Sequence, residues 1–192
     1  ELAIKCEEAG CDAVVVEGFE AGGHNGRDEI TTLVLVPECV RALSIPVIAA
    51  GGIATGEQMV AARALGAEGV QIGSRFAVTV ESSGHSHFKQ AVVEAGAGDT
   101  QLVMKAHVPV RLLKNKFRDQ VMALENQGAG RQELAELLGT GRARAGMLEG
   151  DLEKGELEIG QVAGLIDDIP TVADLMARLL DEYQITLKRL CS

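Results

Sequence analysis

Aromatic side chains and positive charge are both scarce in this sequence. It has no tryptophan, and Phe, Tyr and Trp together make up only 3% of its 192 residues. So few rings leave few platforms on which the bases of single-stranded nucleic acid can stack. Lys and Arg number 18 against 28 Asp and Glu, for a net charge of −10. Because such a surface repels phosphate backbones, we expect no nucleic-acid partner.

Long hydrophobic runs and cysteine motifs are missing as well. No apolar stretch is long enough to cross a bilayer and no basic-then-apolar leader is present, so we expect no membrane partner and a cytoplasmic protein. The spacings of Cys6, Cys11, Cys39 and Cys191 match no metal or redox motif, and free thiols fit a reducing compartment. The chain starts at Glu1 within a helical pattern, and we expect a further segment before it.

Glycine, by contrast, is abundant, with 23 residues, and its densest stretch follows a run of valines at 14–16. Three consecutive valines indicate a strand buried on both faces, as in a parallel sheet covered by helices. The loop that follows, 17–26, contains four glycines, two carboxylates and one histidine, His24. Glycine lets a backbone approach a ligand closely, and histidine titrates near neutral pH. The pattern is typical of a catalytic loop, with His24 as the candidate catalytic residue.

Two further apolar runs end in glycine in the same way. Strands are predicted at 45–50 and 70–74, and helices at 31–43 and 57–65. The stretch 10–16 also resembles 66–72, with one complete βα unit between them. Repeated units of this size predict a parallel α/β fold, a (β/α) barrel with its glycine loops on the active face. A doubly wound open sheet is the alternative.

The remainder of the chain has a different pattern. We expect 1–81 to be barrel, 82–155 an inserted lid or substrate subdomain, and 156–192 a return to the barrel with a closing helix at 172–187. Five basic residues at 105–118 are either a solvated face or an attraction for a phosphorylated partner. His85 and His87 have no third metal ligand nearby, so we expect no metal site.

The dipeptides Gly51–Gly52 and Gly73–Ser74 end consecutive predicted strands. Backbone N–H groups in such loops bind phosphate, and the last two loops of a barrel are the usual place for this. The alternative is that the glycines only make tight turns. Neither loop matches a P-loop or a G-x-G-x-x-G fingerprint, which argues against a nucleotide triphosphatase and a Rossmann dehydrogenase.

Several stretches resemble a known flavoprotein family: Glu17–Gly26, Pro46–Ile53, Gly69–Phe76, Val110–Phe117, Glu149–Asp151 and Gly160–Leu165. The family unites nitronate monooxygenases (2-nitropropane dioxygenases) with FabK-type enoyl-acyl-carrier-protein reductases, and the match covers nearly the whole chain. The resemblance implies a TIM (β/α)8 barrel with FMN over its C-terminal face. It also implies that this chain carries the last three strands, an inserted lid and the closing helix.

The resemblance further implies a role for individual residues. Those that would approach the FMN are Glu17, Gly22, Gly23, Gly51 and Gly52, and those that would hold its phosphate are Gln71, Ile72, Gly73 and Ser74. His24 matches the active-site histidine of the family. The carboxylate of Glu17 stands where the monooxygenases tend to have an amide, which is more like the reductases.

Two enzyme functions follow from the resemblance. One is reduction of a trans-2-enoyl thioester, small or linked to acyl carrier protein, by NADH or NADPH through FMN. The other is oxidation of an alkyl nitronate with FMN and O₂. The stretch 31–36 and the basic residues at 105–118 favour the reductase. A non-catalytic phosphate-binding barrel is a third hypothesis, and a homodimer is an open expectation.

Overall fold

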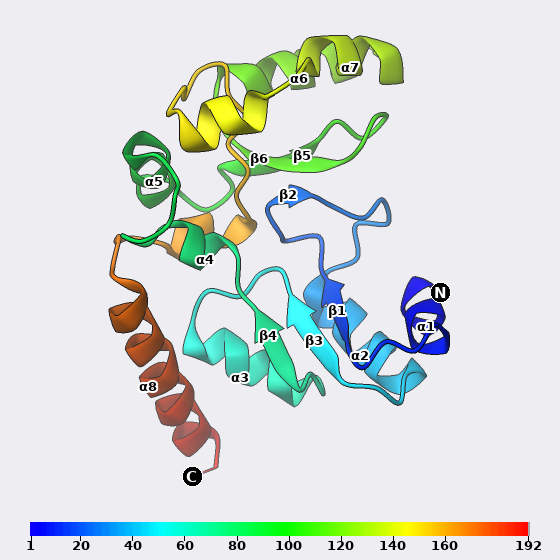
Figure 1. Cartoon of the computed structure of the whole chain (residues 1–192), viewed down its shortest axis with the longest axis vertical. Helices are drawn as coiled ribbons and strands as arrows, with labels where there is room; N and C mark the ends of the chain where they lie inside the picture. The colour runs from blue at the N-terminus through cyan, green and yellow to red at the C-terminus, as the bar shows by residue number, and fades with distance from the viewer. Residues whose placement is uncertain (192) are drawn as a thin grey trace.

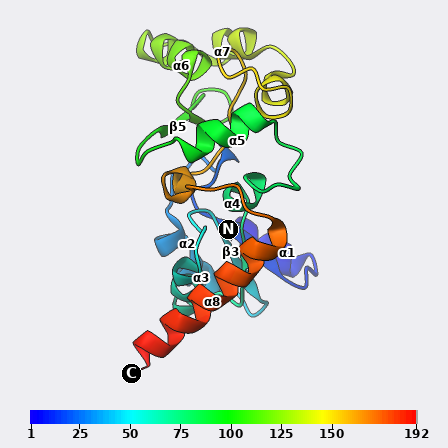
Figure 2. The ribbon, with the colours of Figure 1, turned by 90° about the vertical axis from the view of Figure 1, so that its left-hand side faces the viewer.

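A computed structural model describes residues 1–191 as two bodies arranged along the long axis of the molecule (Figure 1). The first is built on a parallel sheet with the strand order β1-β3-β4, and the second on an antiparallel sheet with the order β2-β6-β5. In two perpendicular views the second body lies beyond the carboxyl ends of the parallel strands (Figures 1 and 2).

The first body consists of alternating helices and strands. Its elements are α1 (Leu2–Glu8), β1 (Val14–Glu17), α2 (Thr32–Ala42), β3 (Val47–Ala50), α3 (Gly56–Ala64) and β4 (Gly69–Gln71). Gly10 and Gly66, with φ of +88° and +99°, follow α1 and α3 where a helix stop is expected. Thr55 begins α3 with a capping box, since its hydroxyl accepts from the Gln58 N–H and the Gln58 side chain accepts in return. The predicted parallel α/β pattern is confirmed.

The core of this body lies on one face of the parallel sheet. Val14 pairs with Val47 and Val16 with Ala49, and all four are buried against α2 and α3. The prediction that the valine strand is buried on both faces is wrong, because Val15 is 48% exposed. Successive residues of a strand point to opposite faces, so Val15 points away from the face that Val14 and Val16 share.

Most elements of the second body lie within the stretch 82–155. Its elements are α5 (Ser86–Val93), β5 (Thr100–Val103), β6 (Val110–Leu113), α6 (Lys116–Asn126), α7 (Arg131–Leu138) and the π-helix η1 (Arg144–Leu148). The short strand β2 (Gly23–His24) joins this sheet by pairing antiparallel with β6. The division at residue 82 stays a prediction. Strand β2 lies before this position in the sequence but belongs to the antiparallel sheet, because the loop that carries His24 pairs with β6.

The chain returns to the first body through the 3₁₀-helix η2 (Gln161–Leu165) and ends in α8 (Val172–Leu190). Helix α8 packs along α3, with Leu175 and Leu179 buried. The carboxylate of Asp168, just before α8, pairs with Arg75 at 2.7 Å and with Arg178 at 2.5 Å. Arg75 belongs to α4 (Ser74–Ala77), so Asp168 ties α8 to the end of the last parallel strand.

The basic residues at 105–118 do not form one exposed patch. Arg111 and Arg118 are buried, while Lys105 pairs with Glu29 and Lys116 with Glu153. The stretch itself contains no acidic residue between Lys105 and Arg118, and the acidic partners of Lys105 and Lys116 come from elsewhere in the chain. The hypothesis that this stretch attracts a phosphorylated partner stays a prediction.

The four cysteines are free thiols. Within residues 1–191, no helix combines the length and hydrophobicity needed to span a bilayer.

Candidate functional site

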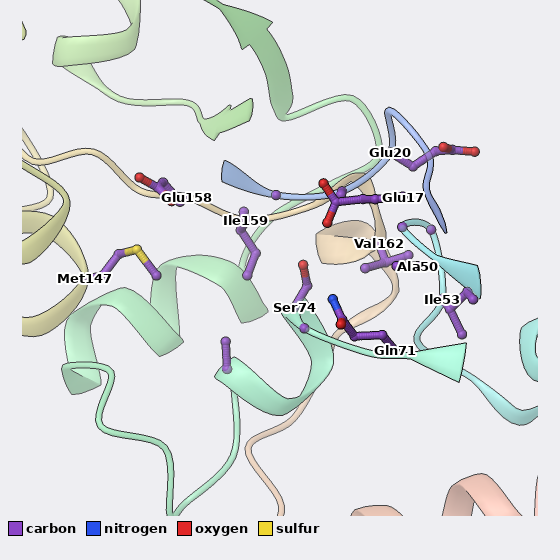
Figure 3. A pocket seen from close by; sticks show the side chains of 16 residues that line it. Glu17, Glu20, Ala50, Ile53, Gln71, Ser74, Met147, Glu158, Ile159 and Val162 are labelled. Carbon is purple, nitrogen blue, oxygen red and sulfur yellow. The ribbon is translucent and has the colours of Figure 1, made fainter. Parts of the chain in front are cut away.

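A cleft of about 270 Å³ lies where the carboxyl ends of the parallel strands meet the second body (Figure 3). Seven of the ten residues predicted to form a site line it: Glu17, Gly22, Gly51, Gly52, Gln71, Gly73 and Ser74. They come from three consecutive strand ends, which the parallel register places side by side. Residues more than 50 positions apart in sequence are thus brought to one edge of the sheet.

Gly51 and Gly52 form the sharp turn at the end of β3. Both have positive φ, +87° and +72°, which L-residues rarely adopt. A Cβ atom on Gly51 would also lie 2.6 Å from the carbonyl oxygen of Gly18. Glycine is therefore required here both by conformation and by space.

Gly22 marks a close crossing of two distant segments. A Cβ atom on Gly22 would lie 2.5 Å from the N atom of Gly160, so no side chain fits. The N–H of Gly160 donates to the Ser74 hydroxyl at 2.9 Å, and the N–H of Gln161 donates to the Glu20 carbonyl at 2.9 Å. These contacts hold together three segments that form one wall of the cleft: the loop after β1, the loop after β4 and the segment before η2.

Gly73 is a glycine that the fold itself does not require. Its φ is −96°, and a Cβ atom there would meet nothing within 4 Å. A position with open space and an ordinary φ accommodates a side chain, and a glycine there leaves the backbone open to close approach by a ligand.

The donors at the cleft suit a phosphate group. Within residues 1–191, the N–H groups of Gly52 and Gly73 donate to no other protein atom. The Ser74 hydroxyl, which accepts from Gly160, keeps its own proton to donate. No Lys or Arg of the described chain lines the cleft, so backbone and hydroxyl groups are the donors that it offers. The open backbone at Gly73 and these free donors fit the phosphate of FMN.

The other three predicted residues lie outside the cleft lining. Ile72 packs into the core between the parallel sheet and its helices. Gly23 and His24 form β2, where Gly23 faces Arg111 and His24 faces Val110 of β6. His24 is exposed, and its position is set by the sheet of the second body rather than by the parallel sheet.

Carboxylates line the cleft on two sides. Partial burial raises the pKa of Glu17, which stands at the end of β1. The Glu20 side chain points away from the cleft (Figure 3), and its carboxylate accepts from the N–H and hydroxyl of Thr32 at 3.0 Å. Glu158 lies beside Ile159 and Met147, with a carboxylate oxygen 2.6 Å from where a Gly23 Cβ atom would be.

Sequence reasoning missed Glu156 and Glu158. Glu156 is only 7% exposed, and burial, followed by the neighbouring Glu158 charge, raises its pKa, which His24 and Arg142 lower. A signal was present, because Glu156 and Glu158 alternate with Leu157 and Ile159 as the two faces of an extended segment do. Among residues 1–191, no group of His, Cys, Asp or Glu is arranged to hold a metal ion.

The sequence profile of the nitronate monooxygenase family matches residues 1–182. The chain belongs to the nitronate monooxygenase family. Among its relatives is a (3aS,4S,5R,7aS)-5-hydroxy-7a-methyl-1-oxo-octahydro-1H-indene-4-carboxyl-CoA dehydrogenase of Rhodococcus jostii, 34% identical over 214 residues, which cover 91% of this chain and 59% of the relative.

Two solved structures superpose on nearly the whole chain. FabK from Thermotoga maritima has a TM-score of 0.92 and 44% identity, over 98% of this chain and 60% of FabK. Nitroalkane oxidase from Streptomyces ansochromogenes has a TM-score of 0.80 and 31% identity, over 98% of this chain and 56% of the oxidase. Both are TIM barrels, and the chain corresponds to part of such a barrel. It spans about six tenths of the length of these relatives.

Proposed function

We propose that the protein to which this chain belongs is an FMN-dependent oxidoreductase that reduces 2-enoyl thioesters. Family membership and the oxidoreductase names of its relatives support the reaction class. The free N–H groups of Gly52 and Gly73, with the Ser74 hydroxyl, support the binding of a phosphorylated cofactor. Bound FMN would supply two-electron chemistry, taking its electrons from NADH or NADPH.

The charge of the site is the observation that favours the reductase over the monooxygenase. An alkyl nitronate is an anion, whereas an enoyl thioester is neutral at its reacting carbons. Glu17 and Glu158 are among the residues that line the cleft, and no Lys or Arg of residues 1–191 lines it. Carboxylates without a basic partner disfavour an anionic substrate and leave a neutral one unaffected. The name of the Rhodococcus relative, which contains a carboxyl-CoA thioester, agrees with this choice.

In this proposal, the residues of the chain orient the substrate and handle its proton. Saturation of an enoyl thioester adds a hydride at the β-carbon and a proton at the α-carbon. His24, exposed on β2 beside the cleft, is placed to donate that proton or to hydrogen-bond the thioester carbonyl. The Gly22–Gly160 crossing closes one wall of the cleft and thereby excludes water from that side.

The test is made on the full-length protein. We expect a flavin absorbance spectrum, bleaching by NADH or NADPH without oxygen, and restoration of the colour by crotonyl thioester. His24→Gln should lower kcat for thioester reduction about a hundredfold while leaving flavin binding intact. His85→Gln, which changes a histidine away from the cleft, is the matched control.

Nitronate oxidation is the second candidate, because relatives named probable nitronate monooxygenase reach 40% identity over 135 residues. Rapid O₂ uptake with propyl nitronate, together with a flavin that NADH and NADPH leave coloured, would replace the reductase by the monooxygenase. A colourless full-length protein that takes up no FMN would contradict both and would leave the non-catalytic phosphate-binding barrel.

A further inference from the structure

The guanidinium of Arg111 is a buried cation without an anionic partner. Arg111 lies on β6 and is 2% exposed. None of the carboxylates of residues 1–191 forms an ion pair with it. Burial lowers its pKa, and the charges of Glu20 and Glu29, which lie beyond ion-pair distance, raise it. Because a buried charge is costly unless it is paired, this arginine requires an explanation.

Contacts within the chain fix the orientation of this guanidinium. Its Nε and Nη2 atoms donate to the carbonyl oxygen of Phe19 at 3.1 and 2.9 Å, and its central carbon lies 4.7 Å from the centroid of the Phe19 ring. Nη1 lies 3.5 Å from the hydroxyl oxygen of Thr100, a long distance for a hydrogen bond. These contacts engage three of the five N–H groups of an arginine, so two remain to donate, and none of the contacts supplies a negative charge.

Arg111 lines a second pocket, of about 250 Å³, which we call the Arg111 pocket. Lys105 and Glu29 also line it and pair with each other at 2.5 Å, so their charges offset and the charge of Arg111 is left in excess. The cleft, by contrast, is lined by carboxylates and by no Lys or Arg of residues 1–191. The Arg111 pocket therefore favours an anion, whereas the cleft does not.

Neutral hydrogen-bond donors complete the lining of the Arg111 pocket. The side-chain oxygen of Gln101 accepts from Nη1 of Arg118 at 3.1 Å, which leaves the amide N–H groups of Gln101 to donate. The hydroxyl of Thr100 and the exposed amide of Gln161 add further donors. An arginine fork surrounded by such donors suits the oxygens of a phosphate group.

The Arg111 pocket and the cleft share a wall. Phe19 lines the Arg111 pocket, and the next three residues, 20–22, line the cleft. Gln161 likewise lines the pocket, and Val162 lines the cleft. The two segments are joined by the hydrogen bond from the Gln161 N–H to the Glu20 carbonyl at 2.9 Å. A molecule whose neutral, reacting end occupies the cleft therefore has an anion-binding pocket next to it.

We propose that the Arg111 pocket binds the diphosphate of an adenosine diphosphate group carried by the co-substrate or the substrate. The inference rests on the proposed function, because NADH, NADPH and coenzyme A thioesters all carry this group. Arg111 provides the charge and the two unused N–H groups, and Thr100, Gln101 and Gln161 provide neutral donors. The charged and the neutral parts of one molecule are thus bound on the two sides of one wall.

The direct test is calorimetric titration of the FMN-loaded full-length protein with ADP, and with adenosine as the ligand that lacks the diphosphate. We expect ADP to bind and adenosine not to bind. Arg111→Gln should weaken ADP binding about tenfold or more, because it removes the buried charge. Since Arg111 also holds the Phe19 carbonyl, this variant alone would not separate binding from folding.

Gln161→Glu separates the two effects, because Gln161 is exposed and the substitution adds a negative charge to the pocket. It should also weaken ADP binding about tenfold. Gln184→Glu, the same change at an exposed position of α8 outside the pocket, is the matched control and should bind ADP as wild type does. Absence of ADP binding, or ADP binding that both pocket substitutions leave unchanged, overturns the proposal.

Steady-state kinetics distinguish the two sources of the diphosphate. If the pocket holds the dinucleotide, Gln161→Glu should raise KM for NADH or NADPH about tenfold. If it holds coenzyme A, the same variant should raise KM for crotonyl-CoA and leave KM for crotonyl-pantetheine, which has no diphosphate, unchanged. A working reductase whose KM values all ignore the substitution overturns this inference alone. Because the ADP titration requires no turnover, ADP binding that depends on Arg111 and Gln161 in a protein that takes up no flavin contradicts the proposed function alone.

Discussion

At the scale of single residues, the glycines of the cleft divide into two kinds. Gly22 and Gly51 are required by the fold, because a side chain on either would meet backbone atoms at 2.5–2.6 Å. Gly73 has open space around it and an ordinary φ, so the fold does not require glycine there. Substitution by alanine should therefore destabilise the fold at Gly22 and Gly51 but not at Gly73.

Gly73→Ala tests the phosphate position directly. The substitution should change the free energy of unfolding by less than about 0.5 kcal/mol, because the new methyl group meets no atom. FMN affinity should fall about tenfold, since the methyl group occupies space that the phosphate needs. Thermal unfolding of the FMN-free protein and fluorescence titration with FMN measure the two effects. Unchanged affinity would remove Gly73 from the phosphate site.

Gly22→Ala is the counterpart at a position that the fold requires. The added Cβ atom would lie 2.5 Å from the Gly160 N atom, so the two segments must separate. We expect a loss of about 2 kcal/mol or more in the free energy of unfolding, measured by urea denaturation. Gly26→Ala is the matched control, because a Cβ atom there would meet nothing within 4 Å and the residue has no positive φ. Gly98→Ala is unsuitable, because the φ of Gly98 is +87°.

At the scale of elements, Asp168 joins two helices that are far apart in sequence. Arg75 of α4, with its side chain 4% exposed, and Arg178 of α8 both donate to this carboxylate. The hydrogen bond from Arg178 and the charge of Arg75 hold the pKa of Asp168 below its usual value. The pair thus fixes α8 beside the loop that carries Ser74.

Asp168→Asn should destabilise the protein by about 2 kcal/mol at neutral pH, because it leaves the buried Arg75 without a counter-charge. The loss is smaller than for a fully buried pair, since the Asp168 side chain is 39% exposed. A lowered carboxyl pKa stabilises the fold above the usual pKa and ceases to do so as pH falls through the lowered value. The difference between wild type and variant should therefore shrink in acid, as urea denaturation at several pH values will show.

The packing of α3 against α8 also depends on one residue. A Cβ atom on Gly56 would collide with the backbone N atom of Tyr183, and the Gly56 N–H donates to Glu182 at 2.8 Å. Gly56→Ala should therefore separate the two helices and cost about 3 kcal/mol in the free energy of unfolding. Gly130→Ala, at the start of α7 where a Cβ atom meets nothing, should cost far less. Equal losses would contradict the close packing of α3 and α8.

Local sequence patterns predicted the helices and strands of the first body well. They did not predict contacts between residues that are far apart in the sequence. The strand–glycine repeats located β1, β3 and β4, since glycine turns and apolar runs are local signals. The bases of 105–118 looked like a patch because Glu29 and Glu153, which pair with two of them, lie elsewhere in the sequence. The pairing of β2 with β6 joins residues almost 90 positions apart, and no local pattern indicates such a contact.

At the scale of the whole molecule, the two faces of the parallel sheet differ. One is covered by α2 and α3, and the other leaves Val15 48% exposed. The TIM barrels on which the chain superposes are longer than it is, and it covers 60% of FabK. We expect the remaining strands of a barrel to cover the face that carries Val15.

Val15→Lys in the full-length protein tests this expectation. A lysine at a surface position costs little, whereas one enclosed in a barrel should cost about 2 kcal/mol or more in the free energy of unfolding. Leu148→Lys is the matched control, because Leu148 is 49% exposed on η1 of the second body. Similar small losses for both variants would show that nothing covers Val15.

The crossing of Gly22, Ser74 and Gly160 has a consequence for the order of events during synthesis. The hydrogen bond from Gly160 to Ser74 spans 86 residues, and the whole insert lies between them. A ribosome makes the N-terminal part first, so the glycine loops emerge long before the segment that closes their wall. The cleft is therefore complete only after residue 160 has left the ribosome, and a molecule that needs the whole wall can bind only after that point.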